Sequence, residues 1–155
     1  MKKIAIFPGT FDPFTKGHQS VVQKALPLFD KVIIAIGFNT AKRGFFSLEK
    51  RMEWIRKVYL EEPKVEVKSY DILTVDFCKQ EKASYIIRGL RSGMDFDYEQ
   101  QIAQVNKQLD ASIETIFVLT EARYAAISSS IVREVYRFGK DISDFIPNEL
   151  KNEKL

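Results

Sequence analysis

The sequence of 155 residues contains one cysteine, one histidine and no apolar run long enough to span a bilayer. Because a disulfide and a thiolate zinc site each need more than one cysteine, the lone Cys78 excludes both and fits a reducing compartment. The apolar run from Ile4 to Phe7 is stopped by Pro8 and Gly9, which is typical of a buried strand and not of a signal peptide. We therefore expect a soluble, cytoplasmic protein with no membrane contact, in which Cys78 is a buried apolar side chain.

A strong charge of one sign is also missing. The formal net charge is +3, from 24 Lys and Arg against 21 Asp and Glu. This mild excess suits an anionic ligand, but the clustered Lys and Arg stripe of a nucleic-acid-binding protein is absent. The composition favours phosphates over nucleic acid as partners.

Short aliphatic runs alternate with longer segments of helical period, a pattern typical of repeated β-α units and a parallel sheet. The pattern predicts an α/β fold: a single Rossmann-like domain over residues 1–155, with a five-stranded parallel sheet flanked by helices. The expected strands are Ile4–Phe7, Val32–Gly37, Val65–Ser69, Tyr85–Arg88 and Thr115–Leu119. The expected helices are His18–Phe29, Leu48–Glu61, Val75–Glu81, Phe96–Leu109 and Ser129–Phe138, with a short C-terminal helix after Pro147.

Pro27 conflicts with the expected end of the first helix. A proline late in a helix removes a backbone hydrogen bond and clashes with the preceding turn. We therefore expect Pro27 to kink this helix or to end it.

Four loops after the expected strands carry unusual chemistry: "PGTFDPFTKGH", "NTAKRGFFS", "IRGLRSGMDFDYE" and "TEARYAAISSS". In open parallel sheets, ligands bind outside the carboxyl ends of the strands, where such loops lead into helices. The backbone N–H groups of a helix start have no intrahelical partner and suit a phosphate. In the first loop Gly17 and His18 open the helix, so His18 is either a phosphate ligand or a packing and capping residue.

The serine-rich segment "ISSSIVREV" opens the last expected helix. Three serines at a helix start need be no more than an N-cap, yet capping is compatible with anion binding. Four cations lie between the two helix starts in the sequence. Lys42 and Arg43 are either phosphate ligands or an ordinary pair of solvated surface charges. Arg88 and Arg91 carry guanidinium groups, which suit phosphate oxygens. Tyr98 and Glu99 follow on the next helix. Their spacing is equally consistent with a role in binding and with a structural role, in which the tyrosine packs in the core and the glutamate is solvated.

The residues contain no pair of nucleophile and base. Cys78 is expected in a helix away from the loops, and no second histidine is present. A reaction in which one phosphate attacks a nucleotide α-phosphate needs no protein nucleophile, because the attacking oxygen is already ionised. The loops therefore favour a site for a polyphosphate and a second phosphorylated molecule.

The loop "PGTFDPFTKGH" matches the T-x-G-H signature of the nucleotidylyltransferase superfamily through Thr15, Gly17 and His18, and "ISSSIVREV" matches its serine-rich signature. Together with "IIRGLR" and "DFDYE", these motifs resemble the bacterial phosphopantetheine adenylyltransferase family over nearly the whole chain. The resemblance implies transfer of AMP from ATP to 4'-phosphopantetheine in coenzyme A synthesis, giving dephospho-coenzyme A and pyrophosphate. It also implies Mg²⁺ as cofactor, coenzyme A as a further ligand and a homohexamer.

The resemblance also implies roles for residues at matching positions. It implies three catalytic residues, His18, Thr10 and Lys42. The implied ATP-binding residues are Thr10, Phe11, His18, Gly89, Leu90, Arg91, Glu99, Tyr124, Ala125, Ala126, Ile127, Ser128, Ser129 and Ser130. The implied phosphopantetheine-binding residues are Thr10, Lys42, Leu73, Thr74, Arg88, Tyr98, Asn106 and Glu134. No protein ligand of a metal ion is expected, because no carboxylate cluster is visible in the sequence.

The sequence departs from the family pattern on the pantetheine side. Thr74 stands where the family often has a larger apolar residue, and Pro27 lies in the first expected helix. Two other functions stay open. One is nucleotidylyl transfer to another phosphorylated acceptor, such as nicotinamide mononucleotide or glycerol phosphate, and the other is a module that binds a nucleotide or RNA without catalysis.

Overall fold

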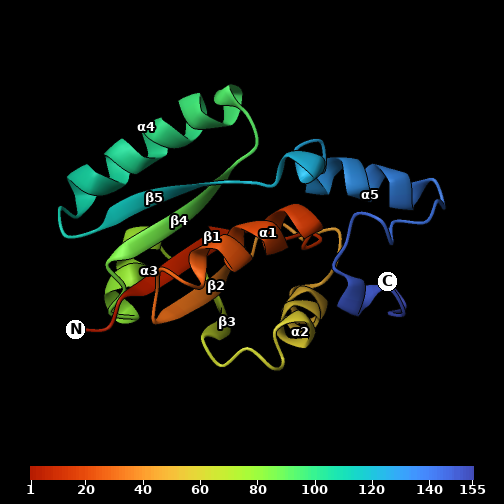
Figure 1. Ribbon diagram of the computed structural model, residues 1–155, viewed down its shortest axis with the longest axis horizontal. Coiled ribbons are helices and arrows are strands. Elements are labelled where there is room, and N and C mark those ends of the chain that lie inside the picture. The colour runs from red at the N-terminus through yellow and green to blue at the C-terminus, as the bar shows by residue number, and fades with distance from the viewer.

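The computed structural model describes residues 1–155 and contains one sheet of five strands with helices on both faces (Figure 1). The strands are β1 Ile4–Gly9, β2 Lys31–Gly37, β3 Val65–Tyr70, β4 Tyr85–Leu90 and β5 Glu114–Leu119. The α-helices are α1 Lys16–Ala25, α2 Leu48–Val58, α3 Thr74–Gln80, α4 Gly93–Leu109 and α5 Ser129–Arg137. Two short 3₁₀ helices follow, η1 Ala122–Tyr124 and η2 Asn148–Leu150. The α/β prediction is confirmed.

All the strands run parallel in the order β3-β2-β1-β4-β5. The chain first builds outward from β1 to β3 and then returns to place β4 on the other side of β1. The connections after β1 and β4 therefore diverge at the carboxyl edge of the sheet, which leaves a crevice between them.

Alternate side chains of the inner strands point to opposite faces of the sheet, and both faces are covered. On one face Ala5 and Ile34 pack with residues of α1 and α2. On the other face Ile6 and Ile33 pack with residues of α3, which include the buried Cys78. The expectation that Cys78 is a buried apolar side chain is confirmed, and burial raises the pKa of its thiol to about 12.

A third apolar cluster lies outside the sheet. Phe46 lies just before α2, and Trp54 lies within it. Both pack with Val132 of α5 and with Ile146 and Leu150 near the C-terminus. This cluster joins α5 and the C-terminal segment to α2, and Figure 1 shows the C-terminal segment lying beside α2. It thereby sets where the start of α5 lies relative to the sheet edge.

Several element ends differ from the sequence-based expectation. The first helix ends at Ala25 and not at Phe29, because Pro27 cannot continue the helical hydrogen bonds; this boundary prediction is wrong, whereas the expected effect of Pro27 is confirmed. The helix predicted to start at Phe96 starts at Gly93, where the side chain of Ser92 accepts a hydrogen bond from Asp95 N. The helix predicted to end at Glu61 ends at Val58, and only a 3₁₀ turn follows Pro147.

No helix combines the length and the hydropathy that crossing a bilayer requires.

Candidate active site

The crevice opens where β1 and β4 separate. These strands pair only at Ala5 with Tyr85 and at Ile6 with Ile86. Beyond this point Pro8 has no N–H to donate to the neighbouring strand. The guanidinium of Arg88 fills the gap instead, because its Nη1 donates to the Pro8 carbonyl at 2.9 Å. The split between the central strands therefore holds a cation at the carboxyl edge of the sheet.

Three cavities meet at Thr10, which lines all of them. The central cavity, about 380 Å³, lies between the β1–α1 loop, the end of β4 and the start of α5. The cationic cavity, about 1110 Å³, lies between the loop before α2, the start of α3 and the basic side chains of α5. The lateral cavity, about 350 Å³, lies between β4, α3 and α4. Thr10 is therefore the one side chain from which all three spaces can be reached.

The ring of His18 is held in place at the third position of α1. Thr15 caps the helix: its hydroxyl accepts from His18 N at 3.4 Å, and its own N–H donates to His18 Nδ1 at 3.0 Å. Phe11 and Phe14 pack on the ring with centroids at 5.0 Å and 5.4 Å. Thr15 and His18 thus form a capping box through Nδ1, which leaves Nε2 without a protein partner beside the central cavity.

His18 is neutral at physiological pH. Burial, with the positive charges of Arg91 and Arg88, lowers its pKa to about 3. Because Nδ1 accepts the Thr15 N–H, the proton of the neutral ring lies on Nε2. His18 therefore offers the central cavity one fixed hydrogen-bond donor that carries no net charge.

The three serines at the start of α5 have three different partners. Ser128 is the N-cap and accepts from Ile131 N at 3.2 Å, so the capping interpretation holds for this residue. Ser129 donates to the Pro13 carbonyl at 2.9 Å and ties α5 to the β1–α1 loop. The hydroxyl of Ser130 accepts a hydrogen bond from Nη2 of Arg133 at 3.2 Å. All three serines line the central cavity, where the first-turn N–H groups of α5 suit an anion.

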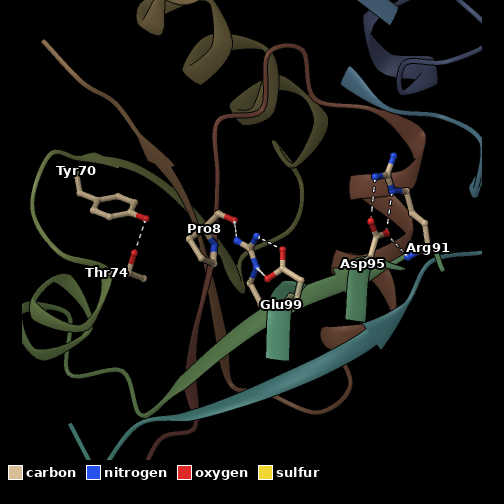
Figure 2. A network of polar contacts seen from close by, with 7 residues as sticks. Pro8, Tyr70, Thr74, Arg91, Asp95 and Glu99 are labelled. Carbon is tan, nitrogen blue, oxygen red and sulfur yellow. Dashed lines mark hydrogen bonds and ion pairs between the residues drawn. The ribbon is translucent and has the colours of Figure 1, made fainter. Parts of the chain in front are cut away.

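Arg88 and Glu99 form a two-pronged ion pair. Nε and Nη2 of Arg88 donate to the two carboxylate oxygens of Glu99, both at 2.6 Å (Figure 2). Glu99 is only 8% exposed, so its charge depends on this partner. Of the five N–H groups on the guanidinium, three are used by Glu99 and Pro8, and two remain for a ligand.

Arg91 is held by Asp95 one helical turn further along the chain. The Asp95 carboxylate accepts from Arg91 N at 2.8 Å, from Nε at 3.1 Å and from Nη2 at 3.2 Å (Figure 2). Although burial acts in the opposite direction, these hydrogen bonds hold the pKa of Asp95 below its usual range. The Arg91 guanidinium is therefore oriented at the mouth of the central cavity before a ligand binds.

The cationic cavity carries a large excess of positive charge. It is lined by five basic side chains, none of which forms an ion pair: Lys42, Arg43, Arg51, Arg133 and Arg137. Of its two acidic side chains, Asp12 accepts backbone N–H bonds through both oxygens, and Asp71 is exposed. Uncompensated cations around one hollow attract anions into it.

The lateral cavity has a different lining. Ile86 and Ile102 give it an apolar wall, and Asn106 and Thr74 place an amide and a hydroxyl on it. Thr74 is fixed by a hydrogen bond of 3.0 Å between its hydroxyl and that of Tyr70 (Figure 2). Arg88 and Glu99 also line this cavity at one side, and away from them its surface suits an uncharged chain with a few polar groups.

The structure brings most of the expected site residues together at these cavities. The central cavity is lined by Thr10, Phe11, His18, Arg88, Gly89, Arg91, Glu99, Ile127, Ser128, Ser129 and Ser130. Lys42 and Leu73 line the cationic cavity, Asn106 the lateral cavity, and Thr74 both of these. Six expected residues line none of the three cavities: Leu90, Tyr98, Tyr124, Ala125, Ala126 and Glu134.

Gly89 is explained by close packing at this edge. A Cβ at this position would lie 2.8 Å from Cγ2 of Val21 on α1. Real Cβ atoms do not approach other carbons so closely, so a larger residue would push α1 away from β4. Gly89 therefore sets the spacing between the two elements that carry His18 and Arg88.

Four residues of the site were not singled out in the sequence. Asp12, Asp95 and Arg133 lie inside the conspicuous motifs, and the i, i+4 spacing of Arg91 and Asp95 is a signal that could have revealed that pair. Arg51 lies in no motif. A basic residue on an amphipathic helix is normally solvated, so only the folded structure reveals that Arg51 is buried.

The structure contains no cluster of side chains of the kinds that commonly bind metal ions. No group of three His, Cys, Asp or Glu side chains is placed to hold an ion. The carboxylates of the central cavity are engaged: Glu99 and Asp95 by arginines and Asp12 by backbone N–H groups. An ion at this site would have to be held largely by ligand oxygens and water.

The chemistry available is that of alignment and charge stabilisation. The cavities offer fixed N–H, hydroxyl and guanidinium donors, and the single imidazole has its Nδ1 occupied. No side chain is placed as a nucleophile next to a base. The site is therefore suited to direct transfer between two phosphorylated molecules.

Comparison with known proteins agrees with this geometry. Residues 6–135 match the family described as cytidylyltransferase-like. The chain is 53% identical to the phosphopantetheine adenylyltransferase of Bacteroides fragilis over 147 residues, covering 95% of this chain and 97% of that protein. It is 47% identical to the phosphopantetheine adenylyltransferase of Cytophaga hutchinsonii over 150 residues, covering 97% of this chain and all of that protein.

A solved structure shares the fold at low sequence identity. The bifunctional NMN adenylyltransferase/ADP ribose pyrophosphatase of Francisella tularensis superposes with a TM-score of 0.75 at 19% identity. The match covers 97% of this chain but only 47% of that longer one. The same fold thus occurs in a protein with few identical residues.

Proposed function

The chain belongs to the cytidylyltransferase-like family and, within it, to the phosphopantetheine adenylyltransferases, and we propose that it transfers the adenylyl group of ATP to 4'-phosphopantetheine. The products are dephospho-coenzyme A and pyrophosphate, so the enzyme acts in coenzyme A synthesis. The observation that carries this proposal is the meeting of three chemically different cavities at Thr10. One suits a polyphosphate, one an anion and one a long uncharged arm.

ATP occupies the central cavity in this proposal. The first turn of α5 and the oriented guanidinium of Arg91 bind its phosphates, and Thr10 and His18 reach the α-phosphate. The remaining expected ATP residues Leu90, Tyr124, Ala125 and Ala126 are assigned to the nucleoside end, where the loop after β5 approaches the start of α1. Glu99 contributes by holding Arg88 and not by meeting phosphate, because like charges repel.

Phosphopantetheine binds from the opposite side of Thr10. Its phosphate meets Lys42 and the two free N–H groups of Arg88, and its arm follows the wall of the lateral cavity past Thr74 and Asn106. Leu73, at the edge of the cationic cavity, covers part of the arm. Tyr98 and Glu134 are exposed, which makes them the outermost of the expected contacts.

The reaction is a single in-line displacement. A phosphate oxygen of phosphopantetheine forms a bond to the α-phosphorus of ATP, the bond from that phosphorus to the bridging oxygen breaks, and pyrophosphate leaves. The attacking oxygen is already ionised, so no proton has to be removed. His18 stabilises the charge that develops on the α-phosphate by donating its Nε2 proton in a hydrogen bond.

Mg²⁺ is part of the proposal as an ion that enters with the triphosphate. The residues of the chain do not form a site that would hold it alone, because the carboxylates of the central cavity are already engaged. Bound between phosphate oxygens and water, it would neutralise part of the phosphate charge. We also place the enzyme in the cytoplasm, which fits its lone, buried thiol.

The test of this function is the choice of acceptor. The purified protein, ATP and Mg²⁺ are mixed separately with 4'-phosphopantetheine, unphosphorylated pantetheine, nicotinamide mononucleotide, glycerol 3-phosphate and a short RNA, and pyrophosphate release is measured. We expect release only with phosphopantetheine, because binding along the remote arm aligns the reacting phosphate. Release with nicotinamide mononucleotide would contradict the acceptor assignment. Tight RNA binding without turnover on any acceptor would contradict catalysis.

We further propose that the enzyme assembles as a homohexamer through α4. Four apolar side chains share one face of this helix and are each more than half exposed: Met94 85%, Tyr98 66%, Val105 54% and Leu109 54%. Their spacing places them in one stripe along a helix of 17 residues. Exposed apolar stripes of this kind mark protein contacts. A second copy of the chain is the partner expected in a homohexamer.

The prediction is that Val105→Glu reduces the mass of the assembly. A glutamate in the centre of the stripe would have to be buried in the interface without a partner. Burying such an unpaired charge costs roughly several kcal/mol of association free energy. Light scattering after size exclusion measures the mass, with six copies expected for the wild type. The control is Leu60→Glu, since Leu60 is 76% exposed but lies beyond the end of α2. A monomeric wild type would refute the assembly.

A further inference from the structure

Arg51 of α2 is a buried cation without a carboxylate partner. It is 4% exposed and forms no ion pair. Its guanidinium instead donates to two backbone carbonyls, from Nη1 to Thr10 O at 2.7 Å and from Nε to Phe46 O at 3.1 Å. Because burying a charge is unfavourable unless its donors are satisfied, these two carbonyls are held at fixed positions by Arg51.

Asp12 makes the complementary contacts. It is 5% exposed, and its Oδ2 and Oδ1 accept from Phe45 N at 2.6 Å and from Phe46 N at 2.9 Å. The backbone of Phe46 is thus bound at its N–H by a buried carboxylate and at its carbonyl by a buried guanidinium. Its ring is anchored as well, at 4.9 Å from the ring of Trp54. Phe46 is therefore a fixed point of the loop between β2 and α2.

Both ends of this network lie next to the reacting groups. Lys42 is on the same loop, four residues before Phe46, and lines the cationic cavity. At the other end, the Thr10 carbonyl belongs to the peptide that leads into Phe11, whose φ is +47°. A residue with a side chain rarely adopts such a φ, so this backbone needs contacts that hold it. Arg51 supplies one of them.

We propose that Arg51, together with Asp12, is a positioning residue that fixes the Lys42 loop against Thr10. This inference rests on the proposed function, in which Lys42 binds the acceptor phosphate and Thr10 the α-phosphate. Arg51 acts through these two residues: it sets the separation between the places where the attacking and the attacked phosphate bind. A misplacement of reacting groups by about 1 Å can lower a rate about a hundredfold, so such a contact is kinetically significant.

The first test is the variant Arg51→Gln, which shortens the side chain and removes the fork of donors. We expect the KM for phosphopantetheine to rise about tenfold and kcat to fall about tenfold, while the ATP dissociation constant stays within about twofold. Arg51→Lys, with a single donor group, should lie between Arg51→Gln and the wild type. The matched control is Arg56→Gln on the same helix, because Arg56 is exposed and has no hydrogen-bond partner among the side chains.

A double-mutant cycle with Lys42→Ala separates positioning from general destabilisation. If Arg51 acts on acceptor binding through Lys42 and on the α-phosphate through Thr10, Arg51→Gln changes the KM for phosphopantetheine by less than about twofold once Lys42 is removed. Asp12→Asn, which loosens the same loop from the other side, should show the same dependence on Lys42. A structural role alone would give effects that multiply in the double variants.

The outcomes are distinguishable. A wild type that releases no pyrophosphate from phosphopantetheine overturns the proposed function and the role of Arg51 with it. A wild type that turns over while Arg51→Gln behaves like Arg56→Gln, or while the effects with Lys42→Ala multiply, overturns this inference alone. Thermal melting is recorded for every variant, and if Arg51→Gln, Arg51→Lys and Asp12→Asn all fail to fold, Arg51 is assigned to folding and the inference falls.

Discussion

Replacing His18 by alanine is expected to lower kcat about a hundredfold or more, with the affinity for ATP changed by less than about threefold. The reason is the geometry of the ring. Thr15 and two phenylalanines fix the imidazole before ATP binds, so its Nε2 donor needs no reorganisation when charge develops on the α-phosphate. A donor of this kind binds the transition state more strongly than the substrate.

Pyrophosphate release gives kcat, and calorimetry gives the dissociation constant of ATP. Gln19→Ala is the matched control, because Gln19 is the next residue on α1 and its side chain donates a hydrogen bond only to Glu149, at 3.4 Å. A His18→Ala variant that keeps most of its kcat would show that the ring is only a capping and packing residue. An equal loss in ATP binding and kcat would show that it serves ground-state binding.

The lowered pKa of His18 adds a pH dependence to this prediction. Between pH 5 and 8 the ring of the free enzyme stays neutral, so kcat/KM for ATP should show no inflection from His18. The free energy of unfolding, in contrast to kcat/KM, should depend on pH through His18. The folded-state pKa of about 3 lies below the unfolded value of 6.5, so the contribution is fully present above pH 6.5 and is lost as the pH falls toward 3. An inflection near pH 6.5 that vanishes in His18→Ala would contradict a neutral ring.

Replacing Arg88 by methionine is expected to harm both stability and acceptor binding. Glu99, 8% exposed, would lose its only ion-pair partner, and such losses cost about 3 kcal/mol in the free energy of unfolding. The acceptor phosphate would lose a charged donor with two free N–H groups, which should raise the KM for phosphopantetheine at least about thirtyfold. ATP binding should change less.

A second variant separates these two losses. When Arg88→Met is combined with Glu99→Leu, no buried charge is left without a partner. We therefore expect the double variant to recover most of the free energy of unfolding that Arg88→Met loses, while its KM for phosphopantetheine stays high. Denaturant unfolding and acceptor titration measure the two quantities. Arg91→Met is the comparison, because it should weaken ATP more than phosphopantetheine. Equal losses for both ligands in both arginine variants would refute the assignment of the two cations.

The local parts of the fold were predictable because short-range physics decides them. Alternating aliphatic runs and helical periods identified five strands and five helices, and the effect of Pro27 follows from its missing N–H. The ends of the helices were less predictable. The start of α4 depends on whether Ser92 or a later residue caps the helix, and both are consistent with the sequence.

The sequence by itself determined an α/β fold and pointed to four loops as the candidate site for phosphorylated ligands, because period, turn residues and charge are local properties of a chain. Only the tertiary structure decided which charges neutralise each other and which stay free. Arg88 pairs with Glu99, which is 11 residues away in the sequence, and Arg51 donates to the carbonyl of Thr10, which is 41 residues away. Residue spacing along the chain does not predict either contact. The physical reason is that burial removes water as a partner, so each buried charge must take whatever donor or acceptor the packing of distant segments brings within reach.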